Sequence, residues 1–214
     1  MSWNSRYCSA LSLPSATLFF LQLREFDRCR KLYQKFLEFN PANVYAWIKY
    51  AELEQLLKEE ELCRAVFELA VSQPLLDMPE LLWKAYIDYE FGEGQYDNTR
   101  ELYERLLQRT KHVKVWISYA DMEASLGEFE SEQATFRDRT RAVYKRAEQA
   151  LKEAQLTEER ALLLESWRDF EKAHGDEEAQ ASLRSKMPRK IKKRRKVTND
   201  DGVTKEKRKK KKEC

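Results

Sequence analysis

The sequence contains few residues that break helices and no long apolar run. Its 214 residues include five Gly and five Pro, and no segment alternates in the manner of a β-strand. Charged residues make up 36% of the chain, and no stretch approaches the roughly 20 apolar residues that a membrane helix requires. These absences favour an all-α protein that does not enter a membrane.

Residues that carry chemistry are also scarce. The four cysteines are scattered without a C-x2-C pair, and the chain has two histidines, so neither a zinc site nor a disulfide framework is predicted. Such cysteine usage fits a reducing compartment. A glycine-rich phosphate loop, a G-x-S-x-G motif and a kinase signature are all missing from the sequence. We therefore expect no enzyme activity, no metal and no cofactor.

The most informative feature that is present is a repeated pattern, W-x2-Y-x3-E. Positions i, i+3 and i+7 share one face of an α-helix. The spacing therefore predicts a helix with an aromatic stripe, which favours packing over ligand contact. The copies are Trp47, Tyr50 and Glu54; Trp83, Tyr86 and Glu90; and Trp116, Tyr119 and Glu123.

A second pattern, R-x2-(Y/F)-x2-(A/L), follows each copy of the first. In the first two copies its aromatic stands at i+20 from the Trp, and successive Trp positions recur with a period of roughly 35 residues. These spacings predict helical hairpins stacked into a right-handed solenoid. The copies are Arg64, Phe67 and Ala70; Arg100, Tyr103 and Leu106; and Arg141, Tyr144 and Ala147.

Two degenerate repeats flank these three. Arg30, Tyr33 and Phe36 continue the second pattern upstream, and Leu164, Trp167 and Glu171 continue the first pattern downstream. The predicted organisation is an atypical segment at 1–23, about five repeats at 24–185 and a tail at 186–214. The fourth unit holds about eight extra residues within 128–138, which we expect to face solvent.

The repeated Glu and Arg positions suggest a polar contact between helices. The motif glutamates follow an aromatic on the inward stripe, so arginines of a facing helix, with Arg64, Arg100 and Arg141 as candidates, could hold them by hydrogen bonds. Alternatively, the carboxylates reach the solvated edge of the hairpin. Repetition argues against catalysis, because an active site needs one constellation.

The charge of the chain is divided between body and tail. Residues 186–214 carry 15 Lys plus Arg against 4 Asp plus Glu, which leaves 25 against 33 in residues 1–185. The tail has few apolar residues, so it is predicted to be disordered. Its basic residues could form a nuclear-import signal, contact RNA phosphates or only solubilise the chain. They are Arg189, Lys190, Lys192, Lys193, Arg194, Arg195, Lys196, Lys207, Arg208, Lys209, Lys210, Lys211 and Lys212.

The tandem patterns resemble the HAT (half-a-TPR) repeat. The segments RKLYQKFLEFNPANVYAWIKYAELE and TRELYERLLQRTKHVKVWISYADME, together with the basic run MPRKIKKRRK, are similar to the C-terminal part of the crooked-neck family of pre-mRNA splicing factors. The similarity runs from about residue 24 to residue 214. Members of that family carry many more repeats, so the chain corresponds to a short isoform or a fragment.

The resemblance implies a role as a nuclear scaffold in splicing. The expected partners are the complex around the Prp19 ubiquitin ligase, its Cdc5-like protein, a nuclear import receptor that grips the tail, and snRNA or pre-mRNA. One alternative is an RNA-binding or RNA 3′-end-processing factor, which would need a basic stripe on the solenoid. Another is a TPR-like peptide adaptor with a Lys/Arg clamp for a carboxylate.

The segment at 1–23 matches nothing in the motif. Arg6 precedes the apolar stretch 18–23, but Pro14 interrupts the segment and no small-residue cleavage site follows, which argues against a signal peptide. We expect residues 15–23 to form a helix that covers the open end of the solenoid.

Overall fold

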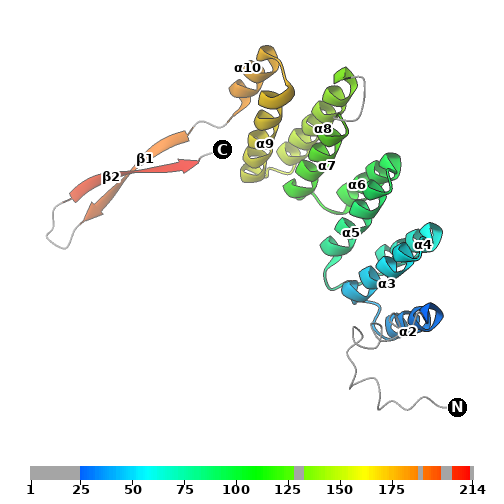
Figure 1. Cartoon of the computed structure of the whole chain (residues 1–214). Helices are drawn as coiled ribbons and strands as arrows, with labels where there is room; N and C mark the ends of the chain where they lie inside the picture. The colour runs from blue at the N-terminus through cyan, green and yellow to red at the C-terminus, as the bar shows by residue number, and fades with distance from the viewer. Residues whose placement is uncertain (1–24, 128–132, 188–189, 199–203, 213–214) are drawn as a thin grey trace. The chain divides into compact units, whose positions relative to one another are not determined.

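The computed structural model describes residues 25–127, 133–187, 190–198 and 204–212, and its side chains are described over 25–127 and 136–187 (Figure 1). Up to residue 186, the regular secondary structure of the described residues is helical. The helices are α2 (Phe26–Phe39), α3 (Val44–Leu56), α4 (Glu60–Val71), α5 (Pro79–Gly92), α6 (Tyr96–Arg109), α7 (Val113–Leu126), α8 (Gln133–Glu153), α9 (Thr157–His174) and α10 (Glu177–Lys186).

Local sequence signals set several helix boundaries. The side chain of Asn43 accepts a hydrogen bond from the backbone N–H of Ala46, which satisfies a free donor at the start of α3. Pro79 opens α5, where the missing N–H and the fixed φ of proline cost nothing. Asp176 caps α10 in the same way as Asn43 caps α3. The hairpin turns are short, as the sequence spacing predicts.

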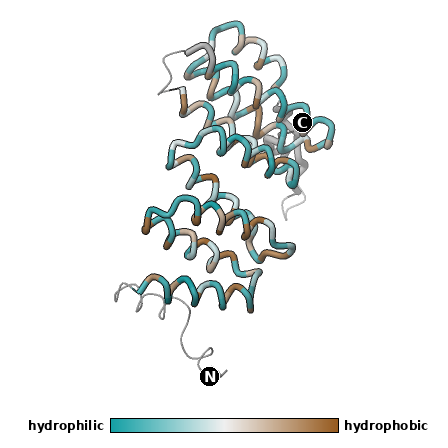
Figure 2. Tube along the Cα trace, turned by 90° about the vertical axis from the view of Figure 1, so that its right-hand side faces the viewer, coloured by the Kyte–Doolittle hydropathy of each residue, from teal (hydrophilic) through white to brown (hydrophobic). Residues whose placement is uncertain are grey.

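The chain divides into two compact units, residues 1–102 and 103–214. In the first unit α3 packs against α4, α2 packs against α3, and α5 contacts both α3 and α4. In the second unit α7 packs against α8, and α9 contacts α7, α8 and α10. Helices therefore alternate between a first-pattern and a second-pattern role. Each helix mixes hydrophobic and hydrophilic positions along its length (Figure 2). The described helices confirm the predicted all-α repeat fold.

The second-pattern helix α8 is longer than its counterparts. It has 21 residues, whereas α4 has 12. Part of the predicted insertion thus extends the helix, while residues 128–132 lie outside the described part. The expectation that this stretch faces solvent is wrong at Phe136, which is 5% exposed. Its ring occupies the space that a Cβ on Gly127 would need and meets the ring of His174 edge-on.

The basic tail differs from the predicted disorder. Residues Lys190–Thr198 (β1) and Thr204–Lys212 (β2) pair as an antiparallel hairpin, with Arg194 opposite Arg208. The expected disorder rested on burial alone, whereas a hairpin also forms through backbone pairing across a turn. The tail is therefore an exception to the all-α rule.

The predicted helix at residues 15–23 lies outside the described residues, as do Arg189 and the spacer at 199–203. The boundaries predicted at 23 and 185 stay predictions.

Candidate functional site

The repeat interfaces are built on stacked aromatic rings. The ring of each second-pattern helix lies nearly parallel to the Tyr-position ring of the next first-pattern helix, an arrangement that stabilises beyond the buried area. Thus a second helix packs against the following hairpin as well as its own. The pairs are Tyr33–Tyr50 at 5.4 Å between centroids, Phe67–Tyr86 at 4.8 Å, Tyr103–Tyr119 at 4.8 Å and Tyr144–Trp167 at 5.5 Å.

An arginine and a glutamate lie one turn from each of these stacks. Arg30 contacts Glu54 with Nε to Oε1 at 2.9 Å and Nη2 to Oε2 at 2.7 Å. Arg141 contacts Glu171 in the same two-bond manner, at 2.9 and 2.8 Å. Such fork-like pairs fix geometry as well as charge. In the third case, Arg64 Nε donates to Oε1 of Glu90 at 2.9 Å.

The carboxylate in each pair is buried and the guanidinium is only partly so. Glu54 and Glu90 are 1% exposed, while the side chains of Arg30 and Arg64 keep about a quarter of their surface in solvent. The hydrogen bond to Glu54 raises the pKa of Arg30 above its ordinary value. The arginine thus lies between solvent and a carboxylate whose burial without a partner would be costly.

Two of the buried glutamates have additional partners that the motif does not specify. Asn98 Nδ2 donates to Oε2 of Glu90 at 3.1 Å, whereas Trp167 Nε1 donates to Oε1 of Glu171 at 3.0 Å. Glu123 is also buried, at 3% exposed. Arg100 Nη1 donates to the side chain of Asp97 on its own helix at 2.9 Å.

A second recurring contact was missed at the level of sequence. In the first three of these stacks, the residue after the second-pattern ring contacts the hydroxyl of the stacked tyrosine, as Gln34 Nε2 does with Tyr50 at 3.2 Å. The hydroxyl of Tyr86 likewise donates to Glu68 Oε1 at 3.0 Å. The signal was available, because the ring is followed by Gln or Glu at residues 34, 68 and 104.

Glu104 joins this contact to a surface ion pair in the second unit. Arg146 donates to both of its carboxylate oxygens at 2.7 Å and lies over the ring of Trp116. The hydrogen bond from Arg146 is the main reason that the pKa of Glu104 falls below its ordinary value, and the bond from Tyr119 acts in the same direction.

The tryptophans of the first pattern are buried in the helix interfaces. The exposed fractions of Trp47, Trp83 and Trp116 are 4%, 3% and 6%. The indole of Trp47 also donates to the backbone carbonyl of Pro41 at 2.8 Å. The basic candidates of the tail, Arg189 excepted, lie on β1 and β2.

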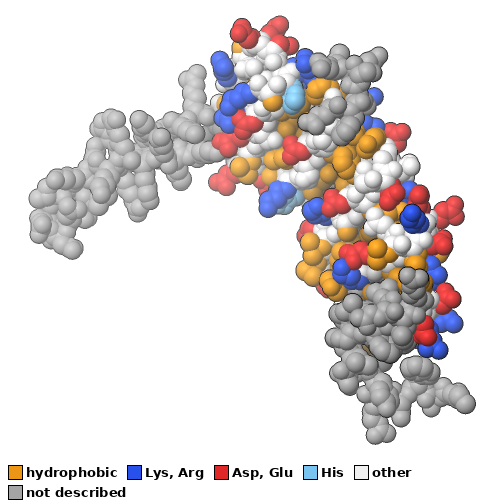
Figure 3. Space-filling view, viewed as in Figure 1, with side chains coloured by type: hydrophobic (Ala, Val, Ile, Leu, Met, Phe, Trp, Pro, Cys, Tyr) orange, Lys and Arg blue, Asp and Glu red, His pale blue; other side chains and the backbone are white. Residues whose placement is uncertain are grey.

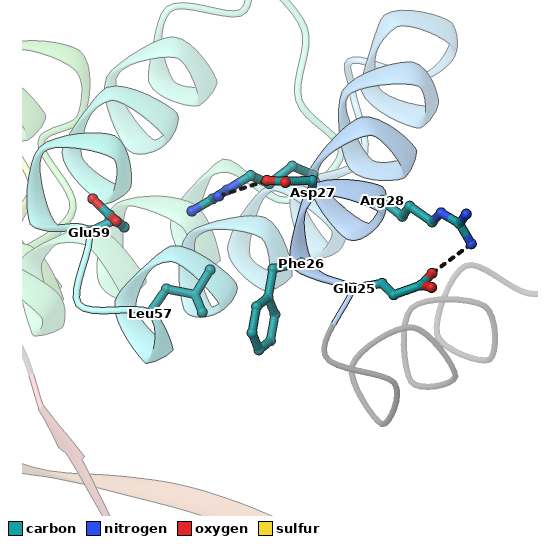
Figure 4. Close-up of a pocket in the computed structure, with 7 residues that line it drawn as sticks. Glu25, Phe26, Asp27, Arg28, Leu57 and Glu59 are labelled. Carbon is teal, nitrogen blue, oxygen red and sulfur yellow. Dashed lines mark hydrogen bonds and ion pairs between the residues drawn. The ribbon is translucent and has the colours of Figure 1, made fainter.

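A cavity of about 500 Å³ opens beside the start of α2 (Figure 4). Glu25, Asp27, Arg28 and Glu59 supply much of its wall, and Arg28 pairs with Glu25 at 2.7 Å. Small-molecule sites are mostly apolar with few polar groups, so this charged wall does not indicate a ligand. The described residues contain no cluster of His, Cys, Asp and Glu able to hold a metal, and none of their helices is long and apolar enough to cross a membrane.

Two features of the described surface bear on partners. Acidic and basic side chains are interspersed on the face shown in Figure 3, where no broad basic stripe stands out among the described residues. In the first unit, Asp77 connects the segment before α5 to the start of α3. Its N–H donates to the carbonyl of Ala42, and its carboxylate accepts from the N–H of Val44. Large apolar side chains close to these residues in the sequence are exposed. This Asp77 edge comprises Tyr45, Leu75, Met78 and Leu81.

Comparisons with known proteins agree with the repeat geometry. Residues 21–213 match the family described as the pre-mRNA-splicing factor Syf1/CRNKL1 C-terminal HAT repeat. Crooked neck-like protein 1 of Homo sapiens is 53% identical over 182 residues, which cover 85% of this chain and 21% of the relative. Pre-mRNA-splicing factor clf1 of Aspergillus fumigatus is 52% identical over 192 residues, which cover 84% of this chain and 28% of the relative.

Among solved structures, the TPR protein YrrB has a TM-score of 0.34 and 12% identity, covering 79% of this chain and 88% of that one. The family match covers most of the chain, so the chain belongs to the Syf1/CRNKL1 C-terminal HAT-repeat family. It spans between a fifth and a third of the length of the curated relatives named above.

Proposed function

We propose that this member of the HAT-repeat family is a non-enzymatic nuclear scaffold in pre-mRNA splicing. The observation that carries the scaffold role is the repetition of one interface, a ring stack beside an Arg–Glu pair, at successive hairpins. These contacts use the polar residues of the motif to hold helices in register, which suits a platform for other proteins. The splicing role is inferred from the named relatives.

The proposed partners are protein components of the Prp19-associated complex, including the Cdc5-like protein. Exposed apolar residues at the Asp77 edge support a protein partner, because clustered apolar surface is typical of interaction sites. Leu75 is 78% exposed there, and Tyr45 is 54% exposed.

Affinity purification from nuclear extract tests this proposal. The tagged chain should recover the Prp19 ligase and the Cdc5-like protein, and Leu75→Asp should reduce their recovery. Leu162→Asp is the matched control, because Leu162 is another exposed leucine and lies on α9 of the second unit. Failure of the unaltered chain to recover either protein would remove the scaffold proposal, and equal recovery with both variants would remove the Asp77 edge from it.

The tail supports a second activity within the same role. Its dense run of Lys and Arg beside Pro188 is typical of a segment that an acidic import receptor grips. The same residues could neutralise phosphates of snRNA or pre-mRNA without reading their sequence. A tail-mediated RNA contact should therefore weaken steeply between 50 and 200 mM salt, by on the order of a thousandfold if about six phosphates are involved.

The main alternative is a HAT-repeat factor that binds RNA through the helices. The excess of acidic residues in 1–185 disfavours it, because phosphate contacts need clustered positive charge. RNA binding that persists at physiological salt after removal of the tail would favour this alternative.

A further inference from the structure

Helix α4 carries two leucines on its solvent side. Leu62 is 47% exposed and Leu69 is 55% exposed, and Ala65 between them is exposed as well. Positions i, i+3 and i+7 share one face of a helix, so the three residues form an apolar row about 10 Å long. This row of Leu62, Ala65 and Leu69 is called the α4 stripe below.

The contacts that hold the repeats together use other sides of α4. The helix packs on α3 through Cys63, whose Sγ donates to the backbone carbonyl of Ala51 at 3.4 Å. It packs on α5 through Phe67, whose ring stacks on that of Tyr86. Both contacts leave the two leucines of the stripe about half exposed, so the stripe is not part of either interface.

The other second-pattern helices show that the fold does not require leucine at these positions. Single exposed leucines are common on protein surfaces, so the comparison between repeats carries more weight than exposure alone. When the helices are aligned on their motif arginines, both leucines of α4 correspond to charged or polar residues elsewhere. Leu62 corresponds to Arg28, Asn98 and Arg139, and Leu69 corresponds to Lys35, Arg105 and Arg146.

The border of the stripe is acidic. Glu61 and Glu68 each precede a leucine of the stripe by one residue, so they lie along the same side of it, and both are exposed. Glu60 is the third carboxylate of α4, whereas the cation of this helix, Arg64, donates to the buried carboxylate of Glu90 at 2.9 Å. A partner that covers the stripe therefore meets carboxylates along its edge, and these favour Lys and Arg in the partner.

We propose that the α4 stripe binds an amphipathic helix of another protein, which has an apolar stripe of its own and Lys or Arg beside it. A facing helix presents side chains at i, i+3 and i+7, the spacing of the row on α4. A partner strand would need a free sheet edge, and a proline-rich segment would need a groove lined by aromatic rings. The α4 stripe shares no residue with the Asp77 edge and is proposed independently of the splicing role.

Fluorescence anisotropy with two labelled peptides tests the proposal on the full-length chain. Both peptides carry the same leucine stripe and have about 18 residues, since shorter helices are marginal in water. One has Lys beside the stripe and the other has Glu. The Lys peptide should bind about tenfold more tightly than the Glu peptide or better, because like charges across an interface are costly.

Substitutions in the chain then locate the binding surface. Leu69→Arg should weaken binding of the Lys peptide by about tenfold or more, since a leucine that binding would bury is lost. Leu75→Arg is the matched control, because it adds the same charge at an exposed leucine of the Asp77 edge in the same unit. It should leave the affinity for the Lys peptide unchanged.

The altered chains should keep their fold, because arginine stands at the position of Leu69 in α6 and α8. If the melting temperature of Leu69→Arg falls nevertheless, Leu62→Asn replaces it, since α6 carries Asn98 there. The same selective loss of affinity then supports the proposal.

Three results would overturn the proposal. Equal losses of affinity with Leu69→Arg and Leu75→Arg would show that the peptide does not bind at the α4 stripe. Absence of binding by the Lys peptide, or tighter binding of the Glu peptide, would remove the basic amphipathic helix as the partner. A dimer of the unaltered chain in light scattering that Leu69→Arg abolishes would assign the stripe to a second copy. No splicing protein enters these measurements, so failure of the splicing role would not alter them.

Discussion

The interface between α4 and α5 in the first unit and that between α8 and α9 in the second perform the same task with different residues. Phe67 stacks on Tyr86 in one, and Tyr144 stacks on Trp167 in the other. Beside the stacks, Arg64 holds Glu90 and Arg141 holds Glu171. Both interfaces therefore contain two stacked rings, although the types of ring differ.

The two interfaces differ in how the buried carboxylate is completed. Arg141 binds Glu171 through two parallel bonds, and the indole of Trp167 adds a third. Glu90 instead accepts a bond from Nε of Arg64 and another from Nδ2 of Asn98. The common requirement is that a buried carboxylate be satisfied, because an unpaired one is costly. The additional donor is Asn98 for Glu90 and Trp167, which stands in the Tyr position of its repeat, for Glu171.

The largest effects should come from the Trp position, which is Trp83 in the first unit and Leu164 in the second. Both are buried, at 3% and 1% exposed. Trp83→Ala should reduce the free energy of unfolding by about 3–5 kcal/mol and Leu164→Ala by about 2–5 kcal/mol, through lost burial and residual cavities. Urea titrations measure both. Leu162→Ala, at an exposed position of α9, is the control, and a loss below about 1 kcal/mol at residues 83 and 164 would contradict the packing role.

The next effect separates the two partners of an ion pair. Arg64→Met should cost about 3–5 kcal/mol, because it leaves the carboxylate of Glu90 buried without its cation. Glu90→Gln should cost less, about 1–3 kcal/mol, since Arg64 retains access to solvent. Arg141→Met and Glu171→Gln should follow the same order.

A double-mutant cycle sharpens this prediction. Arg64→Met combined with Glu90→Leu should recover much of the loss, because an apolar pair of similar volume carries no unpaired charge. A larger loss of unfolding free energy for Glu90→Gln than for Arg64→Met, measured by urea titration, would contradict the prediction. It would show that the buried carboxylate does not need the arginine to offset its charge.

A smaller effect should appear on acidification, at Glu104 in the second unit. Arg146 holds the pKa of this carboxyl below its ordinary value of 4.5. A depressed folded-state pKa means that the stabilisation is present above the unfolded-state value and is lost as pH falls through the folded-state value. Glu104→Gln should therefore lower stability at pH 7 by about 0.2–1 kcal/mol and by less below pH 4, as measured by urea titration at each pH.

The smallest effect should follow removal of the tail. A chain that ends at Met187 keeps Lys186, which pairs with Glu148 and lies over Trp167, so its helical circular dichroism and melting temperature should match those of the whole chain. A two-stranded hairpin is marginal by itself and should add little stability. Nuclear accumulation should nevertheless be lost. A melting temperature that falls by several degrees would show that the hairpin stabilises the helices.

The local pattern predicts the helices well but not the partners of their side chains. The spacing of Trp, Tyr and Glu indicates one face of each first helix, and these side chains are buried. The same pattern cannot show that Arg30 of a degenerate repeat holds Glu54, because side chains so far apart in the chain meet only after folding. It also misjudged Phe136, whose neighbours His174 and Gly127 come from outside its own helix.

Sequence alone determined the class of this protein, the repeated hairpin and the family, because the helical period and the longer hairpin period are both properties of the local chain. Tertiary structure decided which ring stacks on which and how each buried carboxylate is satisfied. The physical reason is that burial makes an unpaired charge or hydroxyl costly. The packing therefore determines which donor satisfies each buried glutamate, Asn98 for Glu90 and Trp167 for Glu171.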